Sequence, residues 1–201
     1  MKNIPLYFSR YALLCSLVLL GACMSGRQGP NGPPPNDPIA SIEASELRSQ
    51  GLAFARRGDL IRAQQYLSAA MQKGFEEKVI VPELVKVCVA SSRLRAALAF
   101  AEPYLDRHPQ DAGMQYVVGT IHMALGNLHS ATAHLAGALE PGNLMHDAYF
   151  SLAMIAHERG QLERERVKLE QYLGAEPDGR YAAKARTMLK RLEFKQVGAS
   201  S

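Results

Sequence analysis

The sequence lacks tryptophan and contains few cysteines or aromatic residues. Of its 201 residues three are cysteines and 7% are aromatic, which excludes a small disulfide-stapled scaffold. No apolar run reaches the roughly 18 residues of a membrane-spanning helix, which excludes a multipass membrane protein. With 47% hydrophobic and 21% charged residues, the chain can bury a core and is not of the disordered class. Alanine and leucine are abundant instead, and this favours helices.

Sequence motifs for catalysis and for cofactor binding are also missing. There is no Gly-rich phosphate loop, no paired-cysteine zinc pattern, no His-Glu-x-x-His and no nucleophile elbow. His122, His129 and His134 fall within one stretch of the chain, but His129 and His134 are five residues apart and do not share a helical face. We expect these histidines to be packed or solvated and not to bind a metal. We therefore predict a protein without enzymatic activity, metal or cofactor.

The first residues have the pattern of an export signal. Lys2 and Arg10 give a positive start, and an apolar stretch of about ten residues (11–20) follows them. The next residues, Leu20-Gly21-Ala22-Cys23, resemble a bacterial lipobox, the processing site of lipoproteins. The resemblance implies a signal peptide over residues 1–22 and a mature chain that begins with lipidated Cys23. Three acyl chains anchor a protein stably, because two already suffice.

The resemblance also predicts where the protein resides. Met24 follows the cysteine, and in the sorting rule of enteric-type lipoproteins a residue other than Asp favours the outer membrane. We therefore expect a lipid-anchored protein of the cell envelope, on the periplasmic face of the outer membrane. Loss of Lys2 and Arg10 would leave 21 basic against 19 acidic residues, an excess too small to indicate nucleic-acid binding. Residues 23–38 are rich in Pro and Gly and are predicted to form a tether.

A spacing of 34 residues recurs through the rest of the chain. Ala63, Ala97 and Ala131 follow this spacing, and so do Gly58, Ser92, Gly126 and Gly160. The spacing divides the chain into four units of equal length, residues 44–77, 78–111, 112–145 and 146–179. Each unit is expected to form two antiparallel helices, because small residues allow close packing and a turn glycine ends the first helix.

These units resemble the tetratricopeptide repeat, which has the same length. The third unit supplies Val118-Gly119, Gly126-Asn127, Ala131, Leu135, Ala138 and Pro141 of the family pattern, and the second unit is the most degenerate. No unit has the early Trp of the family, the second has Ser92 in place of the turn glycine, and the fourth has Glu165 in place of the alanine. The predicted fold is all-α, a tetratricopeptide-repeat solenoid of about four helix pairs (39–179). A C-terminal capping helix (180–195) and a disordered tail (196–201) are expected to follow it.

In the tetratricopeptide family, the first helices of successive units line a concave groove. Transferring those positions predicts a partner-binding groove of Arg48, Leu52, Arg56, Val79, Lys86, Val89, Tyr116, Thr120, Met123, Phe150, Met154 and His157. This groove is mostly apolar, as expected of a protein-interaction site. In the alternative interpretation the short array closes partly on itself, and these residues belong to the core. Cys88 occupies the position of Phe54 and His122 in other units and is expected to be a buried, unreactive residue.

The order of lipobox, Pro-rich tether and repeats resembles the pilotin lipoproteins of type IV pili and the lipoproteins of tight-adherence pilus assembly. The resemblance implies a scaffold that assists assembly or localisation of a pilus or secretin complex and binds one of its subunits. The alternative is an envelope scaffold for motility, envelope biogenesis or peptidoglycan enzymes. An envelope protein or peptide is the expected partner in both cases.

Overall fold

The computed structural model describes residues 41–141 and 145–199, with side chains as far as Phe194. The predicted signal peptide, Cys23 and the tether lie outside these residues. The described part consists of α-helices and has no strand. The helices are α1 (Ala44–Arg56), α2 (Leu60–Gln72), α3 (Glu77–Ala90), α4 (Leu94–Arg107), α5 (Ala112–Ala124), α6 (Leu128–Gly137), α7 (Asp147–Glu158), α8 (Leu162–Ala175) and α9 (Ala182–Ala199). None of these helices is long and apolar enough to cross a membrane.

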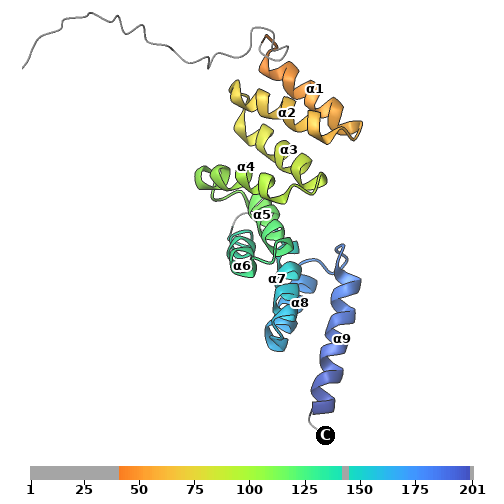
Figure 1. The fold of residues 1–201 in the computed structure, drawn as a ribbon. Helices are drawn as coiled ribbons and strands as arrows, with labels where there is room; N and C mark the ends of the chain where they lie inside the picture. The colour runs from red at the N-terminus through yellow and green to blue at the C-terminus, as the bar shows by residue number, and fades with distance from the viewer. Residues whose placement is uncertain (1–40, 142–144, 200–201) are drawn as a thin grey trace, which may run out of the picture. The chain divides into compact units, whose positions relative to one another are not determined.

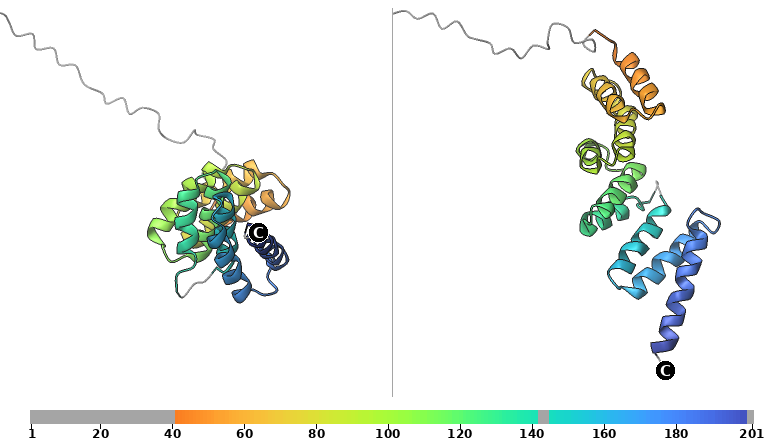
Figure 2. Two further views of the ribbon diagram at one scale, coloured as in Figure 1. Left: turned by 90° about the horizontal axis from the view of Figure 1, so that it is seen from below. Right: turned by 45° about the vertical axis from the view of Figure 1, so that its right-hand side comes forward.

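The first eight helices form four pairs that match the four predicted units. The pairs are α1 with α2, α3 with α4, α5 with α6 and α7 with α8, and each pair stacks on the next in chain order (Figure 1). The last helix, α9, packs against α8 as the predicted capping helix (Figure 2). It extends to Ala199, so residues 196–199 are helical and the prediction of a disordered tail is wrong for them. The pattern is that of a solenoid, in which each pair buries apolar surface only against its neighbours.

Small residues bring the two helices of each pair close together. Ala63, Ala97 and Ala131 are fully buried, as the 34-residue spacing predicts. Gly119 of α5 lies so close to α6 that a Cβ atom there would be 2.7 Å from the Cγ atom of Leu135. In the fourth pair Glu165 is the residue in the place of the alanine, and it is also buried.

The turns between paired helices share one backbone conformation. Gly58, Gly126 and Gly160 have φ between 66° and 80°, the left-handed region that glycine enters without strain. Ser92 adopts the same conformation with a φ of 58°, although it carries a side chain. The second unit therefore keeps the turn that the other units make with glycine.

The core of the described residues consists of three apolar clusters along the stack. One cluster joins α1 to α5, a second joins α6 to α7, and a third joins α7, α8 and α9. In the third, the ring of Phe150 stacks on that of Tyr181 at 4.4 Å between centroids. Tyr172 also meets Phe150, edge to face at 5.8 Å. These aromatic contacts hold Tyr181, the residue directly before α9, against α7.

Candidate protein-binding groove

A groove lies between the first helices of the second and third units. Its volume is about 640 Å³. Its lining is Pro82, Val85, Lys86, Val89 and Ala90 of α3, Gly113, Met114 and Val117 of α5, and Asp111 and Met145. We call it the α3–α5 groove. Most of its lining is apolar, and Val89 is 39% exposed, which is unusual for a large apolar side chain.

The charged residues of the α3–α5 groove differ in their contacts. The Asp111 carboxylate caps α5 by accepting from the Met114 N–H at 2.9 Å, and it accepts from the Tyr104 hydroxyl at 2.8 Å. Lys86 is exposed and has no ion-pair partner among the described residues. A ligand in this groove therefore meets an apolar surface with one available cation.

Sequence reasoning found part of this groove. Lys86 and Val89 were predicted and line it, whereas Pro82, Gly113 and Val117 were not predicted. Their signal is helical spacing, because residues three or four apart share a helix face. Pro82 is four residues before Lys86, and Gly113 is four before Val117. Of the other predicted positions nearby, Val79 is half-buried, and Thr120 is half-buried and donates to the Val117 carbonyl.

The predicted groove residues Arg48, Leu52 and Arg56 lie in α1, and one of these two arginines is paired within the protein. Arg48 forms two hydrogen bonds with the Glu83 carboxylate, one of them from Nε at 2.9 Å, and its guanidinium also lies over the Phe75 ring. The hydrogen bond that Arg48 donates to the Glu83 carboxylate raises the pKa of Arg48. Arg56 is exposed, and Leu52 is half-buried against the first apolar cluster. Arg48 is therefore paired within the protein, although 32% of its side chain stays accessible to solvent.

The C-terminal end of the predicted groove is filled by the protein itself. Phe150 is only 4% exposed beneath Tyr181, so its prediction as an exposed groove residue is wrong. Tyr116, Met123 and Met154 are half-buried against the second and third apolar clusters. Arg180 donates to the Tyr116 hydroxyl at 3.3 Å. Here the alternative interpretation holds, because the capping helix and the residues before it cover this face.

His157 is held by the unusual acidic residue of the fourth unit. Its Nδ1 lies 2.9 and 3.0 Å from the two carboxylate oxygens of Glu165, whose side chain is nearly inaccessible to solvent. A buried carboxylate needs such a partner, because an unpaired charge in the interior is very costly. The departure from alanine is thus accommodated, and α7 and α8 still pack together. His157 makes this contact while 53% of its side chain stays accessible to solvent, so its role in the predicted groove stays a prediction.

The histidines His122 and His134 and the cysteine Cys88, which the sequence analysis considered as possible sites, are packed side chains. His122 is buried, its Nε2 lies 3.1 Å from the Glu102 carboxylate, and its ring stacks on that of His134 at 5.5 Å. No group of His, Cys, Asp or Glu within the described residues could hold a metal ion. Cys88 is fully buried, and this burial raises the pKa of its thiol, as expected of an unreactive cysteine.

Several solved structures have the same arrangement of helix pairs. YrrB, a tetratricopeptide-repeat protein with an unusual peptide-binding site, is similar over 75% of this chain and 76% of its own, with 18% identity and a TM-score of 0.64. A tetratricopeptide repeat protein from Parabacteroides merdae is similar over 76% of this chain and 60% of its own, with 17% identity and a TM-score of 0.67. The chain has the tetratricopeptide-repeat fold.

The MamA protein is a third example of this similarity. It aligns with 74% of this chain and 85% of its own, with 13% identity and a TM-score of 0.63. No protein-family model matches the sequence, and no curated protein matches it. The likeness therefore establishes the tetratricopeptide-repeat fold and no more.

Proposed function

We propose that this protein is a non-enzymatic interaction scaffold that binds a protein or peptide in the α3–α5 groove. The observation that carries the proposal is the open apolar surface around Val89, next to the available cation of Lys86. Apolar patches of this kind are uncommon on monomeric proteins and mark binding sites. YrrB, which shares the fold, is described as having a peptide-binding site, and this adds support for a peptide ligand.

We further propose that the scaffold is a lipoprotein of the bacterial envelope, anchored through Cys23 on the periplasmic face of the outer membrane. Support comes from the sequence Leu20-Gly21-Ala22-Cys23, the apolar stretch before it and Met24 after it. The proposed role is to assist assembly or localisation of a pilus or secretin complex. The second candidate is an envelope scaffold for motility, envelope biogenesis or peptidoglycan enzymes.

The anchor is tested by labelling cells with radioactive palmitate. In the wild-type chain the label should enter the protein, and in Cys23→Ser it should not, because the thiol that carries the diacylglycerol is gone. Cys15→Ser is the matched control, since Cys15 lies in the predicted signal peptide and should not affect labelling. Label that still enters the Cys23→Ser protein would overturn the lipoprotein proposal.

The groove is tested by Val89→Asn combined with Lys86→Glu in the native envelope, followed by chemical cross-linking. The wild-type chain should cross-link to a secretin or pilus subunit, and the variant should lose that product. Ile61→Asn is the control, because Ile61 is an exposed apolar residue outside the groove. Cross-linking to a motility protein or a peptidoglycan enzyme would support the second candidate. An unchanged pattern in the double variant would contradict the groove.

A further inference from the structure

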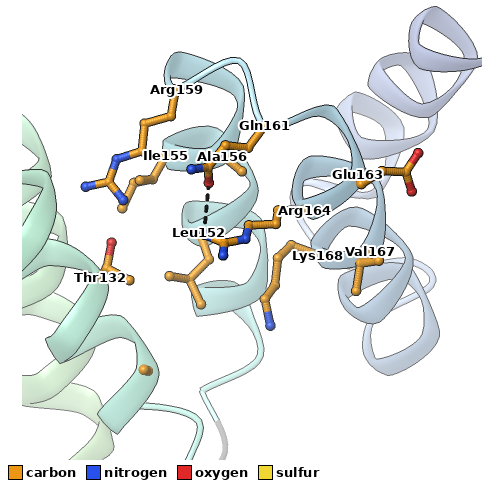
Figure 3. A pocket seen from close by; sticks show the side chains of 11 residues that line it. Thr132, Leu152, Ile155, Ala156, Arg159, Gln161, Glu163, Arg164, Val167 and Lys168 are labelled. Carbon is orange, nitrogen blue, oxygen red and sulfur yellow. Dashed lines mark hydrogen bonds between the residues drawn. The ribbon is translucent and has the colours of Figure 1, made fainter. Parts of the chain in front are cut away.

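A second groove involves both helices of the fourth unit, and none of the predicted site residues lines it. It has a volume of about 450 Å³ and runs between α6 and α8, with α7 as its floor (Figure 3). Its apolar lining is Leu152, Ile155 and Ala156 of α7, Val167 of α8 and Ala136 of α6. Val167 is 42% exposed, so part of this surface is open to solvent. We call it the α6–α8 groove.

Three cations line the α6–α8 groove, and none of them has a carboxylate partner among the described residues. Arg159 extends from the end of α7 toward α6, whereas Arg164 and Lys168 extend from α8 (Figure 3). Arg164 bonds only to the Gln161 side-chain amide, at 3.3 Å. Lys168 bonds to the Gln171 amide at 2.8 Å and lies over the Tyr149 ring, and desolvation lowers its pKa.

The acidic residue of the lining, Glu163, forms an ion pair with a cation outside the lining. Glu163 pairs at 2.6 Å with Arg166, which also approaches Glu170 on the same helix. Arg166 therefore has two carboxylate partners, whereas Arg164 and Lys168, each two residues away on the same helix, have none. The α6–α8 groove has an excess of positive charge over an apolar floor.

The fold does not require this combination of residues. At the three positions spaced by 34 residues, the fourth unit has Arg159, Arg164 and Lys168. The corresponding residues are Leu125, Ser130 and His134 in the third unit, Ser91, Ala96 and Phe100 in the second, and Arg57, Arg62 and Tyr66 in the first. Only the fourth unit places a strong cation at all three. The first two units have an aromatic ring where Lys168 stands.

We propose that the α6–α8 groove binds an acidic amphipathic peptide segment of a partner protein. Apolar side chains of the peptide pack on Leu152, Ile155 and Val167, and its carboxylates pair with Arg159, Arg164 and Lys168. The Thr132 hydroxyl, which donates to the Leu128 carbonyl, and the Gln161 amide, whose oxygen accepts from Arg164, lie at the edges of the groove and have further capacity to bond to polar groups of a peptide. An acyl chain would offer them no partner. This complementarity of charge selects an acidic segment over a neutral or basic one.

The test uses the full-length chain purified in detergent and a fluorescein-labelled synthetic peptide. The peptide has leucines at helical spacing on one face and glutamates on either side of them. Binding is followed by fluorescence anisotropy. The acidic peptide should bind the wild type, and its affinity should fall as salt rises, because salt screens exposed charges. A peptide with glutamine in place of each glutamate should bind at least tenfold more weakly.

Paired variants locate the site. Arg164→Glu should raise the Kd at least tenfold, whereas Arg166→Glu should change it less than about twofold, because Arg166 is already paired. Val167→Asn should weaken binding, and Leu162→Asn should not, since Leu162 is equally exposed but lies outside the lining. Far-UV circular dichroism checks that each variant is folded.

Four results would overturn the proposal. The first is equal binding of the acidic and neutral peptides, and the second is equal effects of Arg164→Glu and Arg166→Glu. The third is loss of peptide binding in Lys86→Glu but not in Arg164→Glu, which would assign the peptide to the α3–α5 groove and leave the proposed function intact. The fourth is displacement of the peptide by phosphatidylglycerol in the micelles, which would make this groove a lipid site.

Discussion

Ser92 is a serine in a turn conformation that suits glycine. Its φ of 58° costs a residue with a side chain about 1–2 kcal/mol. Substitution by glycine removes this cost, but glycine loses more entropy on folding, which offsets part of the gain in stability. Ser92→Gly should therefore raise the free energy of unfolding by about 0.5–1 kcal/mol, measured by urea denaturation.

Gly126→Ala is the matched control for this prediction. A Cβ atom on Gly126 would contact nothing within 4 Å, so its effect isolates the backbone conformation. It should lower the free energy of unfolding by about 1 kcal/mol. Destabilisation by Ser92→Gly would show that the serine side chain contributes more than the turn costs.

His134 makes stability depend on pH. Desolvation and repulsion from His122 lower the pKa of His134 below its usual 6.5, with a smaller opposite effect of Glu102. The unfolded chain then binds a proton more readily than the folded one. The contribution of His134 to stability is therefore full above about pH 6.5 and falls as the pH drops toward the folded-state pKa.

His134→Gln tests this dependence. The loss of stability between neutral and mildly acidic pH should be smaller in the variant than in the wild type, measured by urea unfolding at each pH. His129→Gln is the control, because His129 is exposed in the same helix and has no resolved contact with His122. An equal pH dependence in wild type and His134→Gln would assign the effect to other groups.

At the scale of the helix pair, Gly119 and Leu135 set how closely α5 approaches α6. A methyl group on Gly119 would lie 2.7 Å from the Cγ atom of Leu135, which is fully buried and cannot easily move. Gly119→Ala should lower the free energy of unfolding by about 1–3 kcal/mol because it overpacks the pair.

A double-mutant cycle with Leu135→Ala checks the cause. Leu135→Ala alone should cost about 2–5 kcal/mol, and the double variant should cost less than the two single changes together, because each change makes room for the other. Simple additivity would show that the two side chains do not compete for the same space.

The helix pairs could be predicted from the sequence because the 34-residue period records contacts that every unit repeats. Ala63, Ala97 and Ala131 face a neighbouring helix for the same reason in each unit, so their spacing locates the pairs. A contact that occurs in only one unit produces no periodic pattern in the sequence. The pairing of Glu165 with His157 is such a contact, and no pattern in the sequence indicates it.

The binding surface was harder to predict for the same reason. Whether a first-helix position is exposed depends on which segments cover the ends of the stack. Tyr181 and Arg180, which cover Phe150 and Tyr116, come from the segment after the last unit. The α3–α5 groove is far enough from that segment to remain open, and two of its residues, Lys86 and Val89, were found from the repeat alone. The α6–α8 groove lies between second helices, where the family pattern does not predict a site.

At the scale of the whole molecule, the capping helix closes the apolar end of the stack. Phe150 is 4% exposed under this helix, so Phe150→Ala should lower the free energy of unfolding by about 3–5 kcal/mol. Phe194→Ala is the control, because Phe194 is 79% exposed on α9 and its loss should change stability little. Urea midpoints of the two variants test this, and similar midpoints would mean that α9 does not seal the stack.

Stacking in chain order also governs how the protein reaches its folded state. Each helix meets mainly the helices next to it in the sequence, so the loops that must close are short and their entropic cost is low. Helical proteins with such local contacts fold within microseconds to milliseconds. The first helix pairs can therefore form before the last segment of the chain is available, and α9, which completes the third apolar cluster, is the final segment to join them.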